Sequence, residues 1–564
     1  MAILTAAVLI GLAGLILRDV LRIRNDLNAG QKRLSHLQLT QIDSRASIEA
    51  TFGTADRRLR AGAGLAAHSP FLGMLTPLPK VGGQINAARD LSRAAAQVAD
   101  IAYRAASNAR TQLDAPRSGP ADRLKLIDNL HQDLLTVGAQ LDRVRPGANG
   151  HLIGTLARAR VDLVSKLAKA HTQLADGLQL TGTLRTMLAG PRTYLILAGN
   201  NAEMRSGGIT TAAGLVRFAG GDMTTGKFIT SYDLFLPDQK KVPVPADLEK
   251  LYGWMAVGQE WRTTTTSPNW PAVASVYAKM SANSALGPVD GVLFVDVVTL
   301  RAVLDVVGPV TVDGTVYRAA NVEEQLLFKN YVLYPTIETT NARRDVQSQV
   351  ANAAFAALRS APFSLPKLAK SLQGATKGRH LLAWSADPAE QAMWTKIGAD
   401  GTIGANDFMV SVQNVSASKL DYFIDPKVNM DIQLFSEHQQ VDLTVTLTNP
   451  RRTQTSAYVE GGSRGYVVPG DQRVYVLLYL PSTAYDLVNH DPQFNTLGTD
   501  GPMVVAGLVY IVPYGQTTQV HVSFKIPVTT TYAHLIPASR LRPVQYTING
   551  IFHADDSTKA LIPL

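Results

Sequence analysis

The stretch GPVDGVLFVDVVTLRAVLDVVGPVTVDGTVY, Gly287 to Tyr317, decides the fold class of the central part of the chain. Its apolar runs predict a strand at Val292–Val295, a helix at Val297–Val307 and, after a Gly-Pro stop, a strand at Val310–Val312. Asp296 stands where a helix N-cap accepts from first-turn amides, and we expect that structural role for it. Strands that alternate with helices predict an α/β domain.

On either side of this region the composition changes. From Arg18 to about Ala189 the sequence is rich in Ala, Leu, Arg, Asp and Gln, which predicts helices. From about Ser416 onward, runs such as RVYVLLYLP and QVHVSFKIPV alternate apolar and polar residues, as in an antiparallel sandwich. We therefore expect a multidomain α+β protein with four parts: a transmembrane signal anchor (1–21), a helical stalk or bundle (22–189), an α/β domain (190–415) and a β-sandwich domain (416–564).

An unbroken apolar run, MAILTAAVLIGLAGLIL, begins the sequence and ends at Arg18. It is close to the lower limit of about 17 residues for a spanning helix. Helix-compatible sequence follows it without a cleavage signal, so we expect a signal anchor rather than a cleaved signal peptide. Arg18, Arg22 and Arg24 follow the run, and by charge alone they argue for a cytoplasmic C-terminal side.

The composition excludes several kinds of site. The 564 residues are 46% hydrophobic and 18% charged, with a formal net charge of +9 and no cysteine. Disulfides, Cys-ligated metals and thiol nucleophiles are therefore excluded. The 11 histidines show no metal-ligand spacing, and the phosphate-loop, nucleophile-elbow and zinc-protease motifs are missing. The positive charge suits an anionic partner, but the basic residues are dispersed and we expect no nucleic acid.

A polar segment separates two apolar runs in YLILAGNNAEMRSGGITTAAGL, residues 194–215. Arg205 offers a planar fork of donors suited to phosphate or carboxylate, and Glu203 would orient it or hold a cation. The candidate ligand-binding residues around them are Asn200, Asn201, Gly207 and Gly208, whose glycines would let the backbone approach a ligand closely. The alternative is a turn that carries a surface ion pair between Glu203 and Arg205.

A second cluster lies in TTNARRDVQSQVANAAFAALRS, residues 339–360. Thr340 or Asn341 would cap a helix whose apolar face carries Val346, Val350, Ala354 and Leu358. Arg343 and Arg344, with Gln347, crowd the first turns, where the helix dipole disfavours cations. This placement favours an anionic ligand nearby, and the alternative is an exposed amphipathic face.

A set of motifs resembles, in order, the domain of unknown function 4012 family, a mainly actinobacterial envelope family. The motifs are LILAGNNAEMRSGG, TSPNWPAVASVY, DGVLFVDVVTLRAVLDVVGPVTV, NVEEQLLFKNYVLYP, RHLLAWSADPAEQAMW and VQNVSASKLDYFID. The resemblance implies an N-terminal anchor and an extracytoplasmic body. We therefore expect a single-pass cell-membrane protein with its body outside, despite the arginines after the apolar run.

The same DGVLFVDVVTLRAVLDVVGPVTV motif, together with ARRDVQSQVANAAFAAL, is more faintly similar to the LytR-CpsA-Psr (LCP) ligases. These enzymes transfer cell-wall glycopolymers from a polyprenyl-pyrophosphate carrier to peptidoglycan, bind the pyrophosphate with arginines and hold magnesium with aspartates. The resemblance implies an LCP-like α/β domain with Arg205 near the pyrophosphate. Arg344 with Gln347, or Arg343, would match the helix arginines.

The sequence departs from the LCP pattern at the metal site. Asn201, Glu203 or Gly207 stands where those ligases carry aspartates. SYDLF keeps Asp233 but has tyrosine where they have arginine, and the paired arginines near LFKNYVLYP are reduced to Lys329. The catalytic candidates are therefore Arg205, Glu203 and Asp233. No metal ligand is assigned, and the cofactor is unknown, with Mg²⁺ expected if the site is LCP-like.

Two functions remain open from the sequence. The first is an LCP-like glycopolymer phosphotransferase with a degenerate metal site, which binds or transfers a polyprenyl-(pyro)phosphate-linked polymer. The second is a non-catalytic envelope scaffold that binds glycan or partner proteins. Glycoside hydrolysis by Glu203 and Asp233 ranks last, because it requires a defined separation of two carboxylates. The expected partners are the membrane through the N-terminal helix, lipid-linked or wall glycopolymer, and envelope proteins.

Overall fold

The computed structural model describes residues 44–564 except 116–118, 149, 151, 337, 361–363, 454, 462–466 and 490–492. The chain divides into two compact units, Met1–Thr186 with Ser364–Lys367, and Met187–Phe363 with Leu368–Leu564. The expected membrane anchor, residues 1–21, lies outside the described residues. Each of the described helices is too short or too polar to cross a lipid bilayer.

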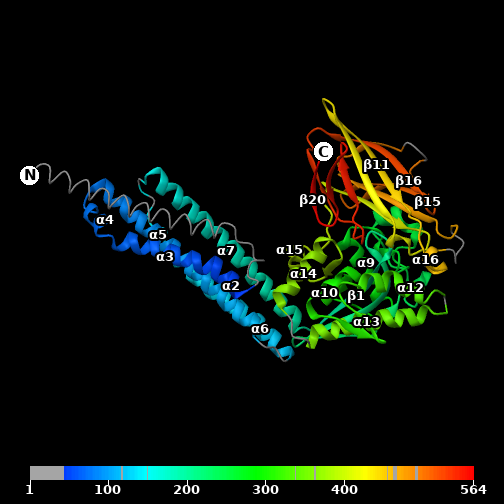
Figure 1. Cartoon of the computed structure of the whole chain (residues 1–564), viewed down its shortest axis with the longest axis horizontal. Helices are drawn as coiled ribbons and strands as arrows, with labels where there is room; N and C mark the ends of the chain where they lie inside the picture. The colour runs from blue at the N-terminus through cyan, green and yellow to red at the C-terminus, as the bar shows by residue number, and fades with distance from the viewer. Residues whose placement is uncertain are drawn as a thin grey trace, which may run out of the picture. The chain divides into compact units, whose positions relative to one another are not determined.

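The first unit consists of helices, and the longer ones pack along one another (Figure 1). They are α2 (Arg45–Ile48), the π-helical turn η2 (Glu49–Gly53), α3 (Thr54–His68), α4 (Pro70–Leu75), α5 (Pro79–Asp114), α6 (Pro120–Leu141) and α7 (Gly154–Ala189). Leu59 of α3 is buried against Ala95, Ala96 and Ala99 of α5. The small side chains let the two helices approach closely, which is the structural use of the alanine-rich sequence.

The second unit begins with a mixed sheet of order β3-β2-β1-β5-β8, with β4 paired to β2. Its strands are β1 (Arg192–Met204), β2 (Gly208–Ala219), β3 (Asp222–Thr225), β4 (Ile229–Thr230), β5 (Gly291–Val295) and β8 (Leu381–Ser385). Strand β1 pairs antiparallel with β2 and parallel with β5. Helix α10 (Val297–Val307) follows β5, and Asp296 caps it by accepting from the amide of Thr299 at 3.0 Å, which confirms its predicted role.

Two apolar clusters form the core around this sheet. Helix α9 (Trp270–Ala282) packs against β1 and β5 in the first. Helices α10 and α13 (Thr340–Ser360) pack together in the second, with the hairpin β6 (Val310–Val312) and β7 (Thr315–Tyr317). The buried face of α13 carries Val346, Val350 and Ala354, as its periodicity predicts. Shorter helices complete the region: η3 (Asp238–Lys240), α8 (Ala246–Tyr252), η4 (Gly253–Met255), η5 (Thr264–Thr266), α11 (Val322–Glu324), η6 (Gln325–Lys329), α12 (Asn330–Leu333), α14 (Leu365–Lys377) and α15 (Pro388–Lys396).

Two further sheets form the remainder of the second unit, seen in yellow to red in Figure 1. One has the order β13-β16-β11-β10-β18-β19 and the other β14-β15-β12-β9-β17-β20. The strands are β9 (Asp407–Asn414), β10 (Asp425–Leu434), β11 (His438–Thr448), β12 (Gln472–Leu480), β13 (Tyr485–Asn489), β14 (Thr496–Asp500), β15 (Met503–Val512), β16 (Thr517–Pro527), β17 (Tyr532–Leu535), β18 (Gln545–Ile548), β19 (Ile551–Asp555) and β20 (Ala560–Pro563). The short helices η7 (Leu420–Tyr422) and α16 (Ala457–Glu460) lie between them in sequence. Side chains of both sheets share one core.

The boundary expected at residue 416 differs from the structure. Strand β9, Asp407–Asn414, pairs with β12 and β17 inside the second of these sheets. All eight of its residues are buried. A fully buried strand carries no alternation that distinguishes one sheet from the next, so its pairing partner, and not its sequence, assigns it to the sandwich.

Candidate binding site: a basic pocket beside the end of strand β1

The polar segment that follows the apolar half of β1 is folded into the interior. Strand β1 continues through a bulge to Met204 and β2 begins at Gly208. Asn200 donates to the Tyr331 hydroxyl at 2.6 Å, and Asn201 donates to the Asp296 carboxylate at 2.8 Å. The alternative of a turn with a surface ion pair is wrong, because Glu203 and Arg205 are each only 7% exposed.

Arg205 joins two parts of the second unit. Its guanidinium donates to the carbonyl oxygens of Met204 and Asn414, the latter at the end of β9, and lies 3.8 Å from Glu203. Burial lowers the pKa of this guanidinium, against the opposing charge of Glu203. Carbonyl oxygens and a carboxylate thus engage Arg205 within the protein, and its expected place beside a bound pyrophosphate stays a prediction.

The glycines of the segment pack closely against neighbouring parts of the protein. A Cβ on Gly208 would lie 2.7 Å from the backbone nitrogen of Asn200, and a Cβ on Gly207 would lie 3.2 Å from the Phe294 ring. The contact with backbone at Gly208 requires a residue without a side chain, whereas at Gly207 the Phe294 ring would have to shift by a few tenths of an ångström. Packing thus accounts for Gly208, and the expected role of these glycines and asparagines in ligand binding stays a prediction.

Beside this segment lies a cavity of about 450 Å³, here called the basic pocket. Its volume is within the range typical of small-molecule sites. The cationic side chains among its described lining residues are Arg262, Arg343, Arg344 and Lys419, and the acidic one is Glu203. Segments far apart in sequence supply them: β1, the polar loop before α9, helix α13, and the segment between β9 and β10.

Aromatic rings hold the cations of the basic pocket in place. Arg262 and Arg344 lie over the ring of Tyr232, with 4.1 and 5.1 Å from guanidinium carbon to ring centroid. Tyr331 and Tyr458 stack with their centroids 5.6 Å apart. Arg343 lies over both rings, at 4.6 and 4.2 Å. Such cation–π contacts fix the direction of each guanidinium and offset part of the repulsion between like charges.

The electrostatics of the pocket favour an anion. Burial would raise the pKa of Glu203, but Lys419 and Arg205 hold it below its ordinary value, so this carboxylate is ionised and paired. Burial would also raise the pKa of Tyr458, but the charges of Lys419 and Arg343 lower it. A lowered phenol pKa means that negative charge is stabilised at that point of the wall.

The remaining predicted residues divide between the pocket and the surface. Gln347 lines the pocket and donates to the carbonyl of Leu326 at 3.3 Å. Lys329 is on the surface, where it pairs with Glu324 at 3.1 Å. Asp233 is exposed and accepts from the Thr230 hydroxyl at 2.9 Å. Because the pKa of Glu203 is lowered, it is unsuited to the general-acid role that glycoside hydrolysis requires.

Sequence reasoning missed Arg262, Lys419, Tyr331 and Tyr458 as site residues. All four lie in irregular segments or in short helices, where no periodicity marks a face. The described residues contain no group of three or more His, Cys, Asp or Glu that could hold a metal ion. The basic pocket is therefore suited to binding an anionic group directly through cationic side chains.

Comparison with known proteins gives one match. Residues 189–331 match the model of a family described as "Protein of unknown function (DUF4012)". The matched segment contains β1, β2, β5 and α10, and it carries Glu203, Arg262 and Tyr331 of the basic pocket. No curated protein and no solved structure matches the chain. The similarity to the DUF4012 family therefore holds for residues 189–331 of this chain.

Proposed function

We propose that the basic pocket binds the phosphate or pyrophosphate group of a polyprenyl-linked cell-wall glycopolymer. In this proposal the chain is a single-pass, membrane-anchored envelope protein with an extracytoplasmic body. The observation that carries the proposal is the convergence of four cationic side chains on one cavity. Lys419 is paired with Glu203 and Arg262 with Glu260, so Arg343 and Arg344 supply the positive charge in excess of the carboxylates.

The guanidinium groups match the chemistry of phosphate. A guanidinium presents its donors in a rigid planar fork that fits two phosphate oxygens at once. Arg344 is half-buried at the pocket wall, so its donors are accessible to a ligand that enters. The hydroxyl of Tyr232, the residue that both Arg262 and Arg344 contact, lies on an exposed side chain at the same wall.

We favour binding over transfer for this site. In the LCP ligases that the sequence resembles, phosphoryl transfer depends on magnesium held by aspartates, and the described residues here contain no group of three or more His, Cys, Asp or Glu that could hold a metal ion. Mg²⁺ as a cofactor belongs to the transferase alternative. The β-sandwich, whose core includes side chains of helix α8, would then present the bound polymer to wall glycan or envelope proteins.

The test compares two arginines of the same helix in the full-length protein. The binding of farnesyl pyrophosphate and of a polyprenyl phosphate is measured by calorimetry, with the uncharged polyprenol as comparison. We expect Arg344→Ala to weaken phosphate binding about tenfold or more, since a charge-assisted hydrogen bond contributes roughly 1.5–3 kcal/mol. Arg359→Ala is the matched control. Arg359 lies in the last turn of α13, is exposed and pairs with Asp222 at 3.2 Å.

Equal affinity for the phosphate and for the uncharged polyprenol would contradict the proposal, as would unchanged binding in Arg344→Ala. Added Mg²⁺ distinguishes a protein that only binds the phosphate from one that transfers it. With a polyprenyl-pyrophosphate-linked glycan and a glycan acceptor, Mg²⁺-dependent transfer of the glycan phosphate to the acceptor with release of polyprenyl phosphate would establish the transferase alternative. Binding that EDTA leaves unchanged supports the binding function.

A further inference from the structure

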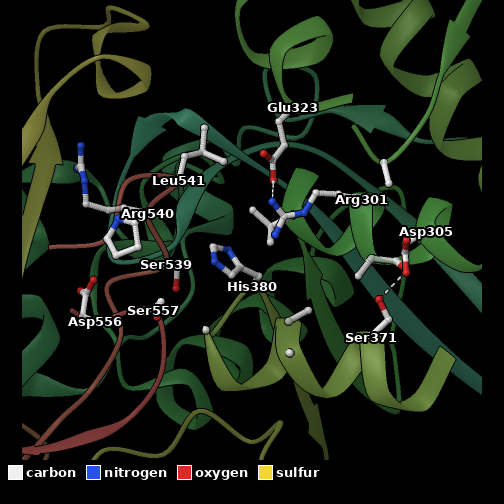
Figure 2. Close-up of a pocket in the computed structure, with 17 residues that line it drawn as sticks. Arg301, Asp305, Glu323, Ser371, His380, Ser539, Arg540, Leu541, Asp556 and Ser557 are labelled. Atoms are coloured by element: carbon white, nitrogen blue, oxygen red, sulfur yellow. Dashed lines mark hydrogen bonds and ion pairs between the residues drawn. The ribbon is translucent and has the colours of Figure 1, made fainter. Parts of the chain in front are cut away.

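A second cavity, of about 400 Å³, lies in the second unit (Figure 2). Helix α10, helix α14 and the segments that flank β18 and β19 supply its lining residues. Its walls carry small side chains, among them Ala302, Gly374, Ala375 and Gly378. The polar groups among the described lining residues are a histidine, two arginines, carboxylates and serines, and the basic pocket shares none of these residues.

His380 is held in one orientation in this cavity. Its Nδ1 lies 2.6 Å from Oδ2 of Asp296, whose carboxylate also accepts from Asn201 at 2.8 Å and from the amide of Thr299 at 3.0 Å. A carboxylate that accepts from these donors acts as an acceptor toward the imidazole too, so the hydrogen-bond network assigns a proton to Nδ1. Nε2 then carries no proton, and its lone pair can accept a hydrogen bond.

The Nε2 atom faces the cavity without a partner. His380 is 9% exposed and lines the cavity, and no described residue forms a hydrogen bond with its Nε2. Gly378 keeps the space beside the ring open, because a Cβ there would lie 3.2 Å from Nε2 and 2.8 Å from Cδ2. An oriented ring nitrogen that opens into a cavity and has no partner among the described residues can accept a hydrogen bond from a ligand hydroxyl group.

Both arginines among the described residues that line the cavity are paired with carboxylates, Arg540 with Asp421 at 3.0 Å and Arg301 with Glu323. Arg301 pairs with Glu323 at 2.9 Å, as the dashed line in Figure 2 shows. The two side chains present both donors and acceptors, and Ser557 adds a hydroxyl from the opposite wall. Because both arginines are engaged by carboxylates, and Asp305 and Asp556 also line the cavity, an anionic ligand gains little here, in contrast to the basic pocket.

We propose that this cavity binds a neutral, hydroxyl-rich small molecule of monosaccharide size, with Nε2 of His380 accepting a hydrogen bond from one of its hydroxyl groups. Arg301 and Glu323 donate to and accept from neighbouring hydroxyl groups. This binding does not depend on the anion site of the proposed function, so either can fail without the other.

The experiment uses saturation-transfer NMR on the full-length protein with glucose, galactose, arabinose and N-acetylglucosamine as probes, and glucuronate as the anionic comparison. We expect at least one neutral sugar to bind at millimolar concentration and to shift the Cε1–H resonance of His380. His380→Gln is expected to weaken that binding about tenfold, as for the loss of one hydrogen bond. Gly378→Val should abolish it by filling the space beside the ring.

Arg344→Ala, in the basic pocket, is the control and should leave sugar binding unchanged. If either cavity variant fails to fold by circular dichroism, the shift of the His380 resonance in the unaltered protein decides the question. Three results would overturn the proposal: no binding of any of the four neutral sugars, binding of glucuronate alone, or retained sugar binding in a folded Gly378→Val protein.

Discussion

Lys419 and Glu203 form a buried ion pair in the wall of the basic pocket, with side chains 8% and 9% exposed. Burial alone would lower the pKa of Lys419, but the carboxylate raises it, so both partners are charged. Such a pair contributes little over an apolar replacement, whereas removal of one partner leaves an uncompensated charge in the interior. At the scale of the residue, Lys419 therefore both stabilises the fold and supplies positive potential to the pocket.

This argument predicts the result of a double-mutant comparison. Lys419→Met should destabilise the second unit by about 3–5 kcal/mol, and the double variant Glu203→Gln with Lys419→Met by much less. All five tryptophans lie between residues 254 and 394, so denaturant unfolding followed by tryptophan fluorescence reports on this unit. A Lys419→Met protein as stable as the unaltered one would show that the pair is not buried as described.

At the scale of the element, the connection between β1 and β2 sets the position of the pocket. Three residues, Arg205 to Gly207, join the strands, and the Arg205 amide donates to the Gly207 carbonyl at 2.7 Å. Gly208 then passes directly over the backbone of Asn200. This close approach turns β2 back along β1, and it leaves Glu203 at the pocket wall while Arg205 is directed toward β9.

A single methyl group tests this geometry. Gly208→Ala places a Cβ 2.7 Å from backbone atoms of Asn200, which cannot move aside as a flexible side chain would. We expect a loss of stability of about 1–3 kcal/mol or more, as for other overpacked sites, together with weaker anion binding in the basic pocket. Gly226→Ala is the matched control, since its Cβ would lie 3.8 Å from the nearest atom, the Leu215 carbonyl oxygen. Similar melting temperatures for the two variants would contradict the argument.

At the scale of the second unit, the core of the sandwich extends into the α/β region through helix α8. Leu248, Leu251 and Tyr252 of α8 belong to the same apolar cluster as both sandwich sheets. The Tyr252 hydroxyl lies within hydrogen-bond distance of the Tyr479 hydroxyl and donates to Asp500 at 3.4 Å. Burial raises the pKa of Asp500 to about 7. A titrating carboxyl group thus lies where the two regions meet.

The raised pKa predicts how stability depends on pH. Because the folded-state pKa of Asp500 lies above its unfolded value, its contribution is fully present below about pH 4 and is lost as the pH rises through about 7. Asp500→Asn removes this loss, so at pH 8 the variant should be more stable than the unaltered protein by up to about 4 kcal/mol. The two proteins should converge near pH 4. Thermal melts across this range provide the measurement, and parallel pH profiles for the two proteins would contradict the prediction.

The sequence by itself determined the local elements and some of the site. Hydrophobic periodicity predicted β5, α10 and the buried face of α13, and the position of Asp296 before an apolar run predicted its cap, because these features depend on neighbours within a few residues. The arginine-rich start of α13 likewise predicted Arg343 and Arg344 as pocket residues.

The tertiary structure alone decided which polar residues face the interior, the pocket or the solvent. Arg205 and Arg344 are chemically identical, yet one is engaged by Asn414 and the other lines the cavity. Glu203 meets Lys419 across 216 positions of sequence, and β9 joins the sandwich through its pairing with β12. The burial and electrostatic environment of a side chain depend on segments that are distant in sequence and close in space. A local sequence pattern does not predict which segments those are.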